Sequence, residues 1–232
     1  MSKAQPDLIE TPLPGQRRLK IKTDAKIVRL PSSELHRALS AIVHAACTEP
    51  DRPELNAVHI AAHDELVFTA TDGHQMAQWK QDAEELPSEP CAALIQLVDI
   101  QRLIPLLAID AKVMDQACID FEDSVVTLKD GTILPLGRIS MDPPPYDTIW
   151  PNTPPEAVTG IGFTASLMAK VIKAFTAAGG KNVVVCQVFR GELGGMVFGA
   201  AKVPELSVIL MPARTSEEAP LGPGALIEVP TP

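Results

Sequence analysis

One helical pattern occurs three times along the chain, and this repeat restricts the folds that the sequence can adopt. In each copy, apolar residues stand at positions i, i+3, i+4 and i+7, which form one buried face of a short helix. The three copies are Leu35, Ala38, Leu39 and Ile42, then Ile100, Leu103, Ile104 and Leu107, and finally Met168, Val171, Ile172 and Phe175. Repetition of this kind predicts three copies of one structural unit.

Strand-like segments flank each predicted helix in the same order. One short apolar segment precedes each helix, at 26–30, 92–96 and 160–163. Strand-like runs follow each helix, at 57–62, 66–70 and 76–80, at 117–121, 124–128 and 132–138, and at 182–189, 196–199 and 206–211. Polar and glycine-containing turns separate many of these runs, as in antiparallel hairpins. The unit is therefore predicted to be a strand, a helix and three antiparallel strands, which makes an α+β protein.

Composition and charge limit the class of protein. Hydrophobic residues make up 46% of the 232 residues and charged residues 21%, near globular averages, and the formal net charge is −9. An acidic chain is not expected to be wrapped by nucleic acid, although a local basic stripe is compatible with this total. Residues 1–15 lack the pattern of a signal peptide, and no window is apolar enough to span a membrane. We therefore expect a cytoplasmic protein.

Three short motifs connect the chain with a known family. Residues 70–76 read Ala-Thr-Asp-Gly-His-Gln-Met, residues 143–151 read Pro-Pro-Pro-Tyr-Asp-Thr-Ile-Trp-Pro, and residues 209–214 read Ile-Leu-Met-Pro-Ala-Arg. In this order they resemble Ala-Thr-Asp-Gly-His-Arg-Leu, Phe-Pro-Asp-Tyr-Arg-Arg-Val-Leu-Pro and Met-Pro-Met-Arg of the bacterial sliding clamp, the beta subunit of DNA polymerase III. Taken singly, Thr-Asp-Gly is also an ordinary turn and Leu-Met-Pro an ordinary strand end.

The resemblance implies a DNA-clamp fold, in which repeated strand-helix-strand units place their helices on one face of antiparallel sheets. Residues 25–152 are similar to one complete clamp domain of two units, and 160–214 to a half-domain of one unit, with a linker at 153–159. Residues 1–24, basic and proline-containing, and residues 215–232 are expected to be mobile tails. The family has six units and this chain three, so ring closure stays open.

The unpaired third unit predicts an oligomer. A half-domain would leave an apolar helix side and a sheet edge without the partner unit that the family supplies, and such surfaces are normally covered. A second chain related by a two-fold axis would cover them most simply. The alternative is a monomer whose apolar tail segment, residues 225–229, folds back over the edge.

The motifs imply a cleft that binds short peptides of DNA polymerases or other replication and repair proteins, as expected of a processivity factor. Gln75 stands where the family has arginine, Met76 where it has leucine and Ala213 where it has methionine, so peptide preference is expected to differ. The resemblance assigns to the cleft Leu55, Thr71, Gly73, His74, Gln75, Met76, Pro144, Ile149, Ile209, Met211, Pro212, Ala213 and Arg214.

The helices carry basic residues at a shared register. Arg37, Arg102 and Lys170 each stand two positions after the first apolar residue of their stripe, and Lys173 follows one turn later. The clamp resemblance implies that these helices line a hole and contact duplex phosphates without reading sequence. Lysine and arginine are also common on ordinary solvated helices, and nearby acidic residues weaken the positive electrostatic potential. The chain is therefore expected either to contact duplex DNA or to act as an adaptor or decoy that binds the peptides off DNA.

An enzymatic function has less support in the sequence. His59 and His63 stand four apart on a predicted strand, about 13 Å apart, which does not suit a shared metal ion. The four cysteines are scattered without a Cys-x-x-Cys pair and are expected to be small buried apolar groups. Asp72 and His74 have no neighbouring nucleophile, and the glycine-rich turn at 191–195 lacks the Lys-Ser/Thr of a phosphate loop. We expect a non-enzymatic protein without cofactor or metal; a metal-dependent hydrolase is the less favoured alternative.

Overall fold

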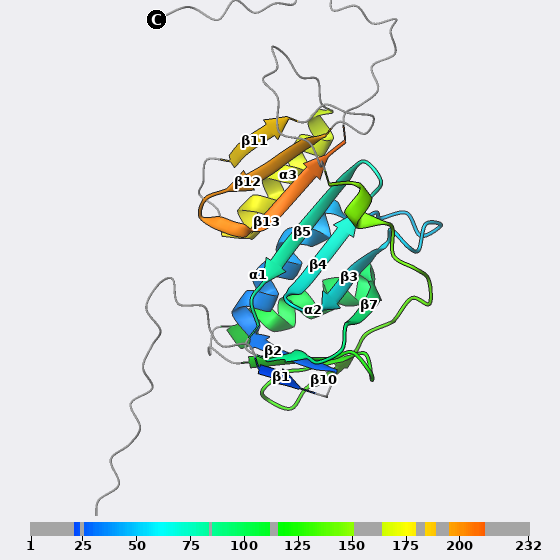
Figure 1. Cartoon of the computed structure of the whole chain (residues 1–232), viewed down its shortest axis with the longest axis vertical. Helices are drawn as coiled ribbons and strands as arrows, with labels where there is room; N and C mark the ends of the chain where they lie inside the picture. Colours follow the sequence, from blue (N-terminus) through cyan, green and yellow to red (C-terminus); the bar gives the residue numbers. More distant parts are fainter. Residues whose placement is uncertain are drawn as a thin grey trace, which may run out of the picture.

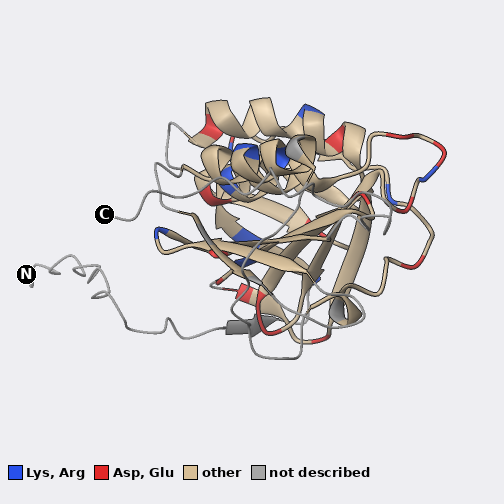
Figure 2. Cartoon of the chain, turned by 90° about the horizontal axis from the view of Figure 1, so that it is seen from above, with Lys and Arg blue, Asp and Glu red and all other residues tan. Residues whose placement is uncertain are grey.

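The computed structural model describes residues 21–23, 26–83, 85–111, 116–150, 164–179, 184–188 and 195–211. Figure 1 shows two β-sheets, with the helices behind the larger one. In Figure 2, turned by 90°, the helices form a layer on one side of the strands. The helices are α1 (Ser32–Ile42), α2 (Leu97–Asp110) and α3 (Ala165–Ala177), with the short 3-10 helices η1 (Val43–Ala45) and η3 (Tyr146–Thr148).

All three predicted helices are present, and their apolar stripes face the strands. The stripe of α1 is fully buried, with Leu39 at 0% exposure. In α2 and α3 the stripe residues are buried or half-buried with one exception, Ile172, which is 57% exposed. The 3.6-residue period therefore predicts the helices, and Ile172 marks a surface that the described residues leave uncovered.

The predicted strands are also present, within a few residues at their ends. In the described part of the chain, the larger sheet has the order β11 (Val184–Val188), β12 (Met196–Ala200), β13 (Val203–Leu210), β5 (Gln75–Gln81), β4 (Leu66–Thr71), β3 (Ala57–Ala62) and β7 (Cys91–Gln96). The smaller sheet has the order β1 (Ile21–Thr23), β6 (Glu85–Pro87), β2 (Ile27–Pro31), β8 (Gln116–Asp120), β9 (Val125–Thr127) and β10 (Ile133–Pro135). The strand predicted at 160–163 lies outside the described residues.

The first two units interlock by exchanging strands. Strand β2, which precedes α1, pairs with β8 of the second unit, and β7, which precedes α2, pairs with β3 of the first unit. Each sheet therefore contains strands of both units, and α1 packs against α2. Neither of these units could complete its sheet alone.

The third unit extends the larger sheet. Strand β13 pairs antiparallel with β5 of the first unit, so that Ile209 lies opposite Met76 and Leu206 opposite Trp79. On the helix side, α3 packs against α1. A single sheet thus runs through the first and third units, although their strands are far apart in sequence.

One strand pair differs from the sequence prediction. Residues 1–24 are predicted to be a tail, but Ile21–Thr23 form β1, which pairs in parallel with β6. The sequence does not predict β6 either, because both strands are only three residues long. Parallel pairing joins segments distant in sequence and leaves no local turn signal.

The buried stripe of α1 predicts a large effect of truncation on stability. Leu39→Ala should lower the free energy of unfolding by about 2–5 kcal/mol, because the side chain is fully buried and a cavity would remain. Chemical denaturation monitored by circular dichroism measures this value.

The control is Ile109→Ala on α2, where the side chain is 67% exposed. This variant should change the free energy of unfolding by no more than about 0.5 kcal/mol. Equal effects of the two variants would contradict the placement of the core.

Candidate peptide-binding site

The turn between β4 and β5 is fixed by its own side chains. Asp72 Oδ1 accepts the backbone N–H groups of His74 at 2.9 Å and Gln75 at 3.0 Å. Thr71 Oγ1 donates to the carbonyl of Gln75 at 2.6 Å and accepts the N–H of Gly73 at 3.1 Å. Aspartate and threonine stabilise turns in this way, which accounts for the Ala-Thr-Asp-Gly-His sequence.

Glycine is required at position 73 for two reasons. Its φ of +87° lies in the left-handed region that residues with a Cβ rarely adopt. A Cβ built there would lie 3.3 Å from Arg52 Nη2 and 3.8 Å from Leu55 Cδ1. The turn therefore packs closely on the residues before β3, among them the buried Leu55.

Strand pairing brings two of the predicted walls together. Ile209, Met76 and Thr71 are cross-strand neighbours on β13, β5 and β4. Beyond the end of β13, the N–H of Met211 donates to the carbonyl of His74 at 2.8 Å. Segments 70–76 and 209–211 therefore lie side by side, whereas Pro212, Ala213 and Arg214 fall outside the described residues.

The third motif covers these strands. Tyr146 packs with Met76 and Ile209 in a buried cluster, and Ile149 and Trp150 lie against it. Segment 143–150 is held by a bond from the N–H of Ile149 to the carbonyl of Tyr146 at 3.1 Å. The described parts of all three sequence motifs thus meet on the sheet face opposite the helices.

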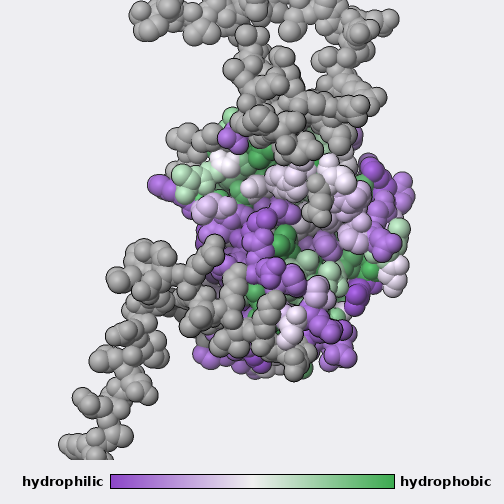
Figure 3. Space-filling view, in the orientation of Figure 1, coloured by the Kyte–Doolittle hydropathy of each residue, from purple (hydrophilic) through white to green (hydrophobic). Residues whose placement is uncertain are grey.

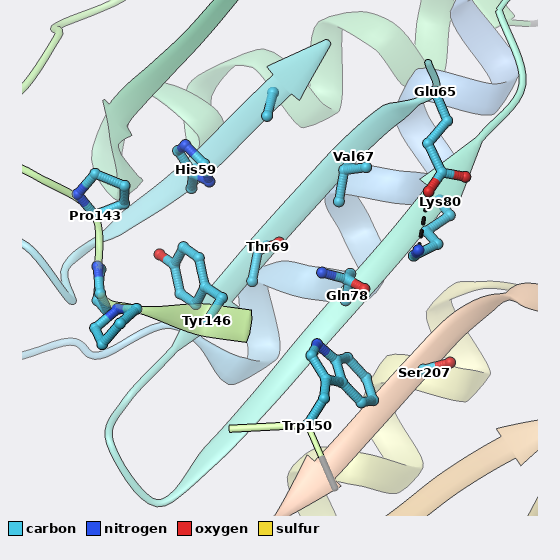
Figure 4. A pocket seen from close by; sticks show the side chains of 13 residues that line it. His59, Glu65, Val67, Thr69, Gln78, Lys80, Pro143, Tyr146, Trp150 and Ser207 are labelled. Carbon is cyan, nitrogen blue, oxygen red and sulfur yellow. Dashed lines mark hydrogen bonds and ion pairs between the residues drawn. The ribbon is translucent and has the colours of Figure 1, made fainter. Parts of the chain in front are cut away.

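A pocket of about 730 Å³ opens beside this cluster, and we call it the Tyr146 pocket. Figure 4 shows Tyr146 and Trp150 projecting over strands of the larger sheet. The floor carries a cross-strand row of polar residues, from Ser207 on β13 through Gln78 and Thr69 to His59 on β3. The lining residues are His59, Ala61, Glu65, Val67, Thr69, Gln78, Lys80, Pro143, Pro144, Pro145, Tyr146, Trp150 and Ser207.

Aromatic stacking and one ion pair define two parts of the Tyr146 pocket. The rings of His59 and Tyr146 are stacked, with centroids 5.4 Å apart and planes at 28°. Burial lowers the pKa of His59 below its ordinary value and raises the pKa of Tyr146, so both rings are uncharged near neutral pH. Elsewhere in the lining, Lys80 Nζ lies 2.9 Å from Glu65 Oε1, as the dashed line in Figure 4 marks.

The surface of the protein is mixed in hydropathy on the face that Figure 3 shows. Figure 3 shows green and pale patches interspersed with purple ones on the face of the molecule turned toward the viewer. A mainly apolar trough with a few placed polar groups is the usual form of a binding site for small ligands and peptides.

The predicted cleft residues differ in how close they lie to the Tyr146 pocket. Pro144 lines the Tyr146 pocket, Met76, Ile149 and Ile209 form the adjoining cluster, and His74 lies exposed in the turn. Gln75 instead faces the helix layer: its Nε2 donates to the carbonyl of His44 and to Asp72 Oδ2, both at 3.2 Å. Strand alternation explains this orientation, because neighbours along β5 point to opposite faces.

The motif comparison missed most of the residues that line the Tyr146 pocket. His59, Thr69, Gln78 and Ser207 belong to no motif, and the resemblance gives Tyr146 and Trp150 only as part of a turn sequence. Strand alternation is the available signal, because it places His59, Thr69 and Gln78 on one face of neighbouring strands.

Two of the four predicted DNA-contacting residues are engaged within the protein. Lys170 Nζ lies 2.6 Å from Asp72 Oδ2, which ties α3 to the β4–β5 turn. Arg37 Nε and Nη2 both donate to the carbonyl of Ala178 at 3.3 Å, and its guanidinium lies 5.3 Å from the ring centroid of Trp79. These two cations hold the third unit against the first.

The other two basic residues are exposed. Arg102 lies 3.2 Å from Asp99 Oδ1 on the same helix, and Lys173 is exposed on α3. Figure 2 shows red as well as blue positions along the helix layer. The potential over this layer is therefore mixed rather than uniformly positive.

The histidines that suggested a metal pair have other contacts. His59 stacks on Tyr146, and His63 Nδ1 lies 3.1 Å from Asp64 Oδ2. Within the described ranges, no three His, Cys, Asp or Glu side chains come together as a metal ion would need. Among the described helices, none has the length and apolar character to cross a membrane.

Solved structures of bacterial sliding clamps have the same fold as this chain. No protein-family model and no curated protein sequence matches it. The DNA polymerase sliding clamp of Pseudomonas aeruginosa matches with a TM-score of 0.67 and 16% identity, over 83% of this chain and 68% of that one. The DNA polymerase III beta subunit of Thermotoga maritima gives 0.65 and 13%, over 88% and 70%.

A third similar structure is the sliding clamp of Bartonella birtlesii bound to griselimycin, with a TM-score of 0.62 and 18% identity, over 89% of this chain and 69% of that one. At these identities the likeness establishes the clamp fold and leaves function to the geometry of the site.

The lowered pKa of His59 predicts a pH dependence of stability. A histidine whose pKa is lower when folded than when unfolded stabilises the fold above its unfolded pKa, about 6.5, and loses this contribution as pH falls. His59→Phe keeps an aromatic ring against Tyr146 and cannot be protonated. Between about pH 7.5 and 5, the wild type should therefore lose more free energy of unfolding than His59→Phe does.

His44 serves as an internal reference in this comparison. Burial, with a smaller effect of Lys173, also lowers the pKa of His44, and this contribution is present in both proteins. The difference between the two pH profiles therefore isolates His59. Parallel profiles would contradict the burial of its neutral ring against Tyr146.

Proposed function

We propose that this chain is a non-enzymatic clamp-fold protein that binds a short linear peptide of a DNA polymerase or another replication or repair protein. The observation that carries the proposal is the Tyr146 pocket, formed where β5 and β13 of two different units meet under segment 143–150. Its volume of about 730 Å³ falls within the usual range of roughly 300–1,000 Å³ for ligand sites.

The lining of the Tyr146 pocket suits an extended peptide with apolar and amide side chains. Pro144, Tyr146 and Trp150 offer apolar surface on one wall, and aromatic residues make good anchors at interfaces. Thr69 and Gln78 offer hydroxyl and amide groups on the floor. Clamp-binding motifs of the Gln-Leu-x-Leu-Phe type, expected from the family resemblance, have this combination of side chains.

The clamp fold supports the same interpretation. The chain has the architecture of polymerase sliding clamps, and one of those structures is bound to griselimycin. Its three sequence motifs, similar to those that border the family's cleft, converge on one face of the larger sheet. The identity of the peptide partner is part of the proposal.

The clamp fold also raises the possibility that the chain binds duplex DNA. Of the two roles compatible with a clamp fold, an adaptor off DNA is favoured over a ring around DNA. Arg37 and Lys170 are engaged in contacts between units, and Asp99 lies beside Arg102. The exposed cations of the described helix layer are thus few for phosphate binding, which depends on the number of charges that contact the duplex.

Filling the Tyr146 pocket should weaken peptide binding. Ser207 lies half-exposed on its floor, on a strand where a large aromatic residue is readily accepted. Ser207→Trp should weaken binding of a fluorescent Gln-Leu-x-Leu-Phe peptide by about tenfold or more, which corresponds to roughly 1.4 kcal/mol. Fluorescence anisotropy gives the Kd, and an unchanged unfolding midpoint shows that the variant is folded.

A pair of histidine variants tests whether the peptide also contacts the β4–β5 turn. His74→Ala alters the turn at the edge of the predicted cleft and should also weaken binding, whereas His36→Ala on α1, on the helix side of the sheet, should not. If Ser207→Trp and His74→Ala both bind the peptide as the wild type does, the proposed site is wrong.

The adaptor role predicts weak DNA binding. At about 150 mM salt the wild type should not be retained on duplex DNA, because few cations are free to displace counterions. Any association at low salt should fall further in the double variant Arg102→Gln, Lys173→Gln. Electrophoretic mobility shifts over a salt series measure this, and loading of the wild type onto circular DNA would instead favour encirclement.

A further inference from the structure

The third unit lacks, among the described residues, the neighbours that complete the first two. In the first unit, α1 packs against α2, and the outer edge of β3 is paired along its whole length with β7. In the third unit, α3 packs against α1 on one side, and β11 pairs with β12 alone within the described ranges. Within the described part of the chain, one side of α3 and one edge of β11 therefore have no neighbour.

The exposed side chain on α3 belongs to the repeated core stripe. Ile172 occupies the same place in its stripe as Leu39 in α1 and Ile104 in α2. Leu39 is fully buried and Ile104 half-buried, whereas Ile172 is 57% exposed. An apolar stripe residue left exposed on a helix, and an unpaired strand edge, are both features that proteins normally cover.

The residues one turn to either side of Ile172 are uncharged, although the exposed Lys173 follows it directly in sequence. Ala169 and Thr176, one turn to either side of Ile172, are exposed and uncharged. Lys170 is directed to Asp72 of the first unit, and Thr176 Oγ1 donates to the carbonyl of Ile172 at 2.8 Å within its own helix. Ala169, Ile172 and Thr176 thus form an uncharged row along α3, which the described residues leave uncovered and which Lys173 borders.

We propose that a second copy of this chain covers the face, with α3 of one copy packed against α3 of the other about a two-fold axis. The first domain shows how two such units combine, since each gives its first strand to the other's sheet and their helices pack together. The third unit of a second copy presents the same open helix face and the same open edge. A two-fold axis pairs identical surfaces and closes without leaving an edge.

The resulting dimer has a shared central domain made of two third units, with one complete domain on either side. This inference is independent of peptide binding, because α3 lies on the opposite face of the sheet from the Tyr146 pocket. The proposal assigns different roles to two exposed isoleucines. Ile172 lies in a core stripe and belongs to the interface, whereas Ile109 lies outside the stripe of α2 and does not.

The solution mass of the full chain tests the dimer. Light scattering coupled to size exclusion should give twice the mass of one chain, 24.8 kDa. Ile172→Glu should halve this mass, because two buried carboxylates would face each other across the axis. The matched control, Ile109→Glu, places the same charge on another exposed isoleucine of a helix and should remain a dimer.

A mixing experiment guards against a variant that merely misfolds. If the axis brings the two copies of residue 172 onto one interface, Ile172→Glu and Ile172→Lys should each be monomeric and should form a heterodimer when mixed. Hydrogen exchange at the amides of β11 should slow as the wild type dimerises.

Three results would overturn the proposal. The first is a full chain that stays monomeric at the highest attainable concentration. The second is a dimer that Ile172→Glu leaves intact. The third is a monomer that dimerises only after deletion of residues 215–232, because the tail would then be what covers the face.

Discussion

The antiparallel pairing of β5 with β13 is the interaction on which the rest of the structure depends. It joins the first unit to the third, sets Ile209 beside Met76, and continues into the bond from Met211 to the carbonyl of His74. The same junction brings α3 against α1, where the Lys170–Asp72 ion pair crosses it. Without this pairing, neither the Tyr146 pocket nor the open face of α3 would exist in its present form.

Strand alternation at this junction divides the molecule into two functional faces. Along β5, Met76, Gln78 and Lys80 point outward to the apolar cluster and the Tyr146 pocket, whereas Gln75 and Trp79 point to the helix layer. The outer face therefore carries the Tyr146 pocket, which we propose as the peptide site. The inner face is occupied by packing between units, because β5 and the helices bury each other's apolar side chains.

The basic residues of the helices also contribute to packing between units. Arg37 and Lys170 are predicted from the sequence to contact phosphates, but each is directed to a group of another unit, the carbonyl of Ala178 and the carboxylate of Asp72. Charge-assisted bonds of this kind are stronger than neutral ones and hold their partners in defined geometry. In this protein, basic residues on the helices thus contribute to holding the third unit in place, which leaves fewer of them for a nucleic acid.

Much of the architecture could be read from local sequence. The apolar stripes on the three helices, the alternating strands and the Asp-Gly turn at 72–73 depend on residues only a few positions apart, so their periods and turn chemistry identify them directly. The family resemblance added the three motifs that converge in space, and with them the neighbourhood of the candidate site.

What sequence could not supply depends on contacts between distant segments. The parallel pairing of β1 with β6, the stacking of His59 on Tyr146 and the inward orientation of Gln75 all follow from strand register, which is fixed only when the sheets assemble. The exposure of Ile172 has the same origin, because its stripe is as apolar as the others and differs only in what packs against it. The sequence by itself therefore determined the units and their periodic faces. Tertiary structure decided which faces meet, because burial is a property of the assembled sheet and not of any one segment.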